Sequence, residues 1–208
     1  MQRDVASGVL LLIGALAGLL IMLLHPTGAE VGAATPGHGM DLLNRLVHGF
    51  ALAVTPAVFL GLLGFARALG HSPLSTAALV VWGYGAVAVM SAAVASGYVT
   101  PSSMHGTAAP EAFAHYSYLW NQGYANVNVA ASGAAMILFG LAMLRHPFGL
   151  RGPAILGIVI GAGLVLGIVT GHLRLNLHGF GLVMLAEAIW LAWLAVVLFR
   201  SPAGRPMA

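Results

Sequence analysis

The chain has 208 residues, of which 60% belong to the hydrophobic set and only 6% are charged. A soluble globular domain draws about a quarter of its residues from the charged set, so this composition excludes a water-soluble protein. It predicts an all-α integral membrane protein that forms a single polytopic domain over residues 1–208.

Three classes of site are excluded by residue types that the chain lacks. It has no cysteine, which rules out disulfides, thiolate metal ligands, iron–sulfur clusters and thioether-linked haem. It has no lysine, which rules out a retinal Schiff base on a side chain. The net charge of +3 comes from arginines that stand singly, which argues against a nucleic-acid partner.

Six segments are long and apolar enough to cross a bilayer, which takes about 20 residues for about 30 Å of hydrocarbon. Polar, turn-forming clusters such as His25-Pro26-Thr27-Gly28 separate them. Glu187 is the one formally charged residue inside the segments. The sequence therefore predicts a six-transmembrane-helix bundle with spans at residues 5–24, 46–66, 77–99, 123–144, 153–171 and 177–199.

The arginines predict the orientation of the bundle, because Lys and Arg concentrate in cytoplasmic loops. With both termini cytoplasmic, only Arg45 and Arg174 face outward. We therefore expect a multi-pass protein of the plasma (inner) membrane, with loops 25–41 and 100–118 outside. The lipid bilayer is its expected partner, and the sequence leaves open other membrane subunits or a second copy of the chain.

Glycines at small-xxx-small spacing predict close helix packing. They occur in the first and fifth spans, at Gly14, Gly18, Gly157, Gly161, Gly163, Gly167 and Gly171.

A short internal sequence repeat contains two histidines. Residues 47–52 and 177–182 share a His-Gly-Phe-small-Leu core, which places His48 and His178 at one depth near the outer boundary. The glycine after each would let a neighbouring backbone or a flat ligand approach, although so short a match in an apolar chain can also arise by chance. This repeat predicts a shared site that binds haem b axially, or that binds a copper or zinc ion together with other outer histidines. These other histidines are His172, His115 and His105.

The remaining histidines have a simpler explanation as solvated or helix-capping side chains. They are His25, His38, His71 and His146. Outer acids could support a metal ion as acceptors for its ligands, and these are Glu30, Asp41 and Glu111.

Polar side chains follow one face of several spans. Just before the second span, Asp41 and Arg45 have the spacing of a helical ion pair at the mouth of the bundle. The same face continues through His48 and Thr55. The third span carries Tyr84, Ser91 and Tyr98, and the fourth carries Asn121, Tyr124, Asn128 and Ser132. Interhelical hydrogen bonds explain such stripes; the alternative is a polar cavity open to the outside.

Glu187 is a functional candidate because an ionisable side chain is costly inside a membrane. Burial disfavours a carboxylate, so we expect its protonated form near pH 7, with Asn128 as the hydrogen-bond partner. It could serve as a proton or cation site at the floor of the cavity, or as a structural hydrogen-bonding group.

Three functions remain open at this stage. The favoured one is an outward-facing histidine site that binds haem b or a transition-metal ion, in a redox or metal-handling protein. The second is a proton-coupled transporter that uses Glu187, and the third is an accessory or assembly subunit of a membrane complex. Familiar enzyme motifs are missing from the sequence, so catalysis stays undecided.

Overall fold

The computed structural model describes residues 4–26, 38–101, 110–147 and 150–200, with the backbone alone at 38–41 and 110–111. Its elements are α1 (Val5–Leu23), α3 (His38–Ala68), α4 (Pro73–Val94), the π-helix η1 (Ala95–Val99), α6 (Pro110–Leu144), α7 (Arg151–Val169) and α8 (Leu177–Arg200). These ranges contain six helices that are long and apolar enough to cross a membrane. The prediction of an all-helical, multi-pass membrane bundle is confirmed to that extent.

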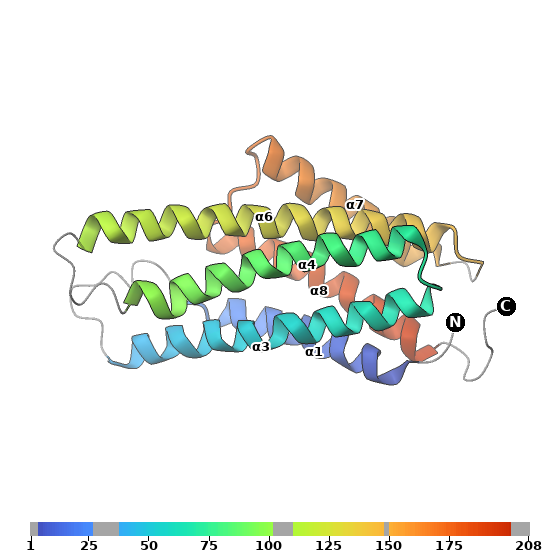
Figure 1. Ribbon diagram of the computed structural model, residues 1–208, viewed down its shortest axis with the longest axis horizontal. Helices are drawn as coiled ribbons and strands as arrows, with labels where there is room; N and C mark the ends of the chain where they lie inside the picture. The colour runs from blue at the N-terminus through green and yellow to red at the C-terminus, as the bar shows by residue number, and fades with distance from the viewer. Residues whose placement is uncertain (1–3, 27–37, 102–109, 148–149, 201–208) are drawn as a thin grey trace.

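The helices lie roughly side by side, and α7 leans away from the others (Figure 1). In the bundle α3 packs against α1 and α4, α6 packs against α4 and α7, and α8 packs against α1. Helix α1 begins and α8 ends at the same end of the bundle, while η1 and the beginnings of α3 and α6 lie at the opposite end (Figure 1). We call this opposite end the η1 end.

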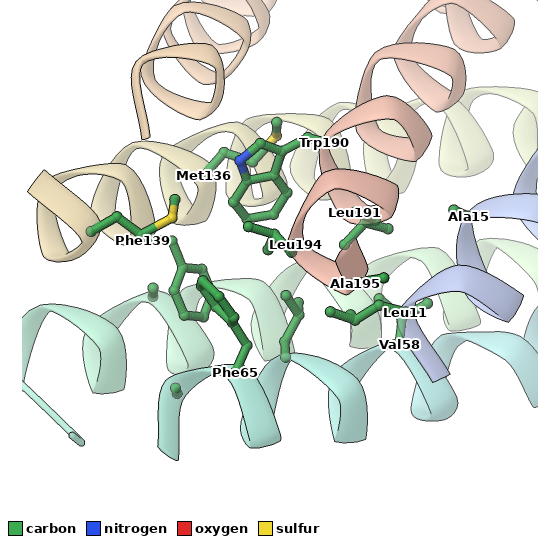
Figure 2. Close-up of a cluster of buried hydrophobic side chains, with 14 of the residues drawn as sticks. Leu11, Ala15, Val58, Phe65, Met136, Phe139, Trp190, Leu191, Leu194 and Ala195 are labelled. Atoms are coloured by element: carbon green, nitrogen blue, oxygen red, sulfur yellow. The ribbon is translucent and has the colours of Figure 1, made fainter. Parts of the chain in front are cut away.

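Large aromatic side chains join the helices in the core. The ring of Phe65 on α3 lies 5.8 Å from that of Phe139 on α6, which in turn lies 6.1 Å from the ring of Trp190 on α8. Trp190 also donates a hydrogen bond of 3.1 Å to the carbonyl of Pro153 on α7. Figure 2 shows these rings, with Leu11 of α1 packed near the other end of the same cluster. The core therefore contains side chains from α1, α3, α6, α7 and α8.

Close glycine packing is confirmed at several of the predicted positions. A Cβ at Gly133 would lie 2.8 Å from the carbonyl oxygen of Gly161, so α6 and α7 touch backbone to backbone. On α1, Gly18 faces Met184 of α8, where a Cβ would lie 2.7 Å from the Met184 methyl. Gly163 differs, because it faces open space. Glycine spacing thus predicted which helices pack closely, but not every residue that does so.

Two predicted spans are shorter than the helices that contain them. Helix α3 begins at His38 rather than at residue 46, and α6 begins at Pro110 rather than at residue 123. Apolar residues mark the part of a helix that suits lipid, whereas backbone hydrogen bonding continues beyond it, and proline is well accepted in the first turn. Both expected outer loops are therefore partly helical.

Candidate functional site

His48 is held in one tautomer inside the η1 end of the bundle. Its side chain is 8% exposed, and its Nδ1 lies 2.8 Å from the carbonyl oxygen of Asn44, one turn earlier on α3. A carbonyl oxygen can only accept, so Nδ1 carries the proton and donates. This leaves the lone pair of Nε2 available. Histidines that bind metals are commonly oriented by such a second hydrogen bond.

His25 lies directly beside His48. It follows the end of α1, and its Nδ1 is 3.0 Å from the carbonyl oxygen of Pro26. The two imidazole rings are 5.1 Å apart between centroids, with 67° between their planes. Each ring therefore has its Nδ1 directed at a backbone carbonyl. From the sequence we expected His25 to be solvated or to cap a helix, and its contact with His48 was not predicted. Its position at the end of the first span nevertheless puts His25 level with the start of the second span.

The π-helix η1 closes over His48 from α4. A Cβ at Gly97 would lie 2.6 Å from the His48 Cβ, so only glycine fits there without a shift. Asn44, which is 4% exposed, donates a hydrogen bond of 2.9 Å from Nδ2 to the carbonyl oxygen of Ser96. Single π-helical turns often occur at functional sites. His48 is thus packed between the end of α1, its own helix and η1.

Asn44 is a second residue that the sequence analysis missed. It lies four residues before His48, so both share a face of α3. The predicted stripe ran through Arg45 instead, and Arg45 is exposed. The buried face is therefore displaced by one residue from the predicted one. The Asp41 side chain lies outside the described residues, so the predicted ion pair of Asp41 with Arg45 stays a prediction.

None of the other predicted histidines that the structure describes joins this pair in a group of three. His178 in the first turn of α8, His172 before it and His115 on α6 are all exposed. His172 contacts Thr170 at 2.9 Å, from Nδ1 to Oγ1. His105 lies outside the described residues. Among the described residues, no group of three or more His, Asp or Glu side chains could hold a metal ion together. A site shared by His48 and His178 therefore stays a prediction.

The glycines of the repeated motif are in contact with protein atoms. A Cβ at Gly49 would lie 2.6 Å from the hydroxyl of Tyr98 on η1. Gly179 packs against the carbonyl of Arg174, in the turn before α8. We expected these glycines to make room for a flat ligand such as haem. The space beside each is instead filled by the chain.

Several side chains of the predicted polar stripes form hydrogen bonds within the bundle. Thr55 donates to the Ala51 carbonyl at 2.8 Å, and Ser91 donates to the Val87 carbonyl at 2.9 Å, both within their own helices. Asn128 of α6 donates to the Gly85 carbonyl of α4 at 3.1 Å. Asn121 and Tyr124 are half-buried, and the Tyr124 ring lies 5.2 Å from that of Trp120. Structural hydrogen bonding thus accounts for Thr55, Ser91 and Asn128.

A cavity of about 550 Å³ forms a groove between α4, η1 and α6. Its lining is mainly apolar, in contrast to the polar cavity that we expected. Among the residues that line it, Ser91, Ser117 and Tyr116 carry hydroxyl groups. The lining residues are Val87, Met90, Ser91, Val94, Ala95, Val99, Phe113, Tyr116, Ser117 and Trp120.

Glu187 has a hydroxyl partner on α6. The Oγ of Ser132 lies 2.5 Å from Glu187 Oε1, and Glu187 as a whole residue is half-buried. The predicted partner, Asn128, is wrong, since its amide bonds to Gly85. Ser132 lies one turn further along the same face of α6. A depth estimate from residue counts assumes straight helices perpendicular to the membrane, and an error of one turn follows when they tilt.

Comparisons with known protein families, with characterised proteins and with solved structures find no match to this chain. Its function therefore has to be inferred from the chemistry of its own side chains. Two places carry such chemistry: the His25–His48 pair at the η1 end, and Glu187 with Ser132 among the spans.

Proposed function

We propose that this protein binds a transition-metal ion, such as copper or zinc, through His25 and His48 at the η1 end of the bundle. One observation carries the proposal: the two imidazoles are neighbours, and each has its Nδ1 directed at a backbone carbonyl. Nε2 of each ring is then the available ligand atom. Neutral imidazole is a ligand that zinc, copper and nickel all accept.

The spacing of the rings suits a single ion. An imidazole nitrogen binds zinc at about 2.0–2.1 Å, which puts the metal roughly 3.2 Å from the ring centroid. Two imidazoles at a tetrahedral angle then have centroids about 5 Å apart. The rings of His25 and His48 are separated by 5.1 Å. The observed separation is therefore close to the one expected for two imidazoles that bind one ion.

Two protein ligands leave coordination positions open. Structural zinc sites are normally closed by four protein ligands, whereas sites that exchange or activate a ligand keep a position for water or substrate. An ion on His25 and His48 would be exchangeable, which suits metal handling better than structural support. His105, which lies outside the described residues, stays a candidate for completing the shell. We favour an ion over haem because protein atoms fill the space beside Gly49 and Gly179.

Metal titration of purified protein in lipid nanodiscs tests the proposal. Calorimetry with Zn²⁺ should show one site, and Co²⁺ should give a visible absorption band as the same site fills. His25→Gln and His48→Gln should each weaken binding at least tenfold, while His178→Gln serves as the matched control in the repeated motif. Unchanged binding in both His25→Gln and His48→Gln would reject this function.

A proton-coupled transporter is the second candidate. Its supporting observation is that Glu187 lies within a candidate span and has a hydroxyl partner on another. Uptake of protons by reconstituted vesicles, compared between the wild type and Glu187→Gln, would test it.

A further inference from the structure

We propose that Glu187 and Ser132 form an exchangeable proton-binding site between α8 and α6. In the loaded state the Glu187 carboxyl is protonated and donates to Ser132 Oγ, which donates in turn to the carbonyl oxygen of Val129. This inference is independent of the metal site, because it concerns different residues and a different ligand.

The hydroxyl of Ser132 has one proton and two neighbouring oxygen atoms. Ser132 Oγ lies 2.5 Å from Glu187 Oε1 and 3.2 Å from the Val129 carbonyl oxygen. A hydroxyl donates once and accepts through its lone pairs, whereas a carbonyl oxygen can only accept. If Glu187 were ionised, both neighbours would compete for one proton. A protonated Glu187 satisfies both contacts, because the carboxyl then supplies the second proton.

The surroundings also favour the neutral acid. The small cavity at Glu187 is lined by Trp82 of α4, Ser132 and Met136 of α6, and Trp190 and Leu191 of α8. None of these five side chains is charged or can titrate near neutral pH. The indole N–H of Trp190 is already bonded to Pro153. A carboxylate here would have no cation from these elements beside it, and an unpaired charge inside a membrane bundle is costly.

The same geometry gives the proton a way to leave. The cavity has a volume of about 10 Å³, which is at the lower limit for one water molecule. A water that enters can accept the proton from the carboxyl and leave with it as a hydronium ion. The Ser132 hydroxyl then turns from Val129 to the carboxylate and stabilises the charge that remains. Two protonation states therefore differ by one hydroxyl rotation and one transferred proton.

Infrared spectroscopy of the protein in nanodiscs tests this proposal. A protonated carboxyl has a C=O stretching band that a carboxylate lacks. We expect the band at neutral pH in the wild type, its loss as the pH is raised, and its absence in Glu187→Gln. Ser132→Ala should shift the band to higher wavenumber, because the acid loses its acceptor. That variant retains Glu187, so the shift can be measured even if Glu187→Gln does not fold.

Asp4 is the matched control within the same chain. It also pairs with a serine hydroxyl, with 2.7 Å between Ser7 Oγ and Asp4 Oδ2, but it caps the beginning of α1 rather than lying among the spans. Asp4→Asn should leave the band unchanged. Absence of a band sensitive to Glu187→Gln at neutral pH would overturn the protonated state. A band that persists at every pH would overturn the exchange.

Discussion

The imidazole ring of His25 lies edge-on to that of His48, with 5.1 Å between the centroids. The two residues come from different helices: His25 follows α1, and His48 lies in the first half of α3. Close packing of α1 against α3, in which Gly14 accommodates Val58, brings them together. The distance between the two rings thus depends on how closely α1 packs against α3.

If both imidazoles bind one ion, their substitutions should not be additive. His25→Gln and His48→Gln should each cost at least tenfold in Zn²⁺ affinity, about 1.4 kcal/mol. The double variant should bind little more weakly than the worse single variant, since one remaining imidazole already makes a poor site. Competition with a chromophoric chelator measures all three. Full additivity would point to two separate ions.

Metal affinity should fall in acid, because only neutral imidazole binds a metal. A protonated imidazole has no lone pair left for a metal, so protons compete with the ion in acid. With two imidazole ligands, the slope of log affinity against pH should approach about two in acid. In His25→Gln it should approach about one. Affinity that does not change between pH 5 and pH 8 would exclude histidine ligation.

Asn44 should position His48 through η1. Asn44→Ala removes the donor to the Ser96 carbonyl, and loss of one partner of a buried hydrogen bond costs about 1–3 kcal/mol of the free energy of unfolding. We expect weaker metal binding as well, because η1 then loses its tie to α3. Asn128→Ala is the matched control, since its amide also bonds to a carbonyl on α4. It should lower stability without changing the metal affinity.

Packing of α6 against α7 should depend on Gly161 but not on Gly163, two residues later on α7. Gly161→Ala places a methyl group against the Gly133 carbonyl and should lower the thermal unfolding temperature. Gly163→Ala enters open space and should leave stability unchanged or raise it, since alanine favours a helix more than glycine does. Equal effects of the two substitutions on unfolding in detergent would contradict this interface.

The six helices could be predicted from sequence because a bilayer demands long apolar segments. The beginnings of α3 and α6 could not, since helical hydrogen bonding continues at His38 and Pro110 beyond the apolar stretch. His48 was found through its repeated motif, whereas His25 has no motif and becomes visible only when α1 and α3 are packed. Asn128 was wrongly predicted as the partner of Glu187 in place of Ser132, one helical turn further along α6, because sequence alone does not give helix tilt.

X-ray absorption spectroscopy of the zinc-loaded protein tests the central claim most directly, because it identifies the ligand atoms around the ion. We predict two imidazole nitrogens at about 2.0–2.1 Å in the wild type. We predict one fewer in His25→Gln and in His48→Gln, and no change in His178→Gln. A zinc shell without imidazole, or a shell that is the same in the wild type, His25→Gln and His48→Gln, would contradict the account.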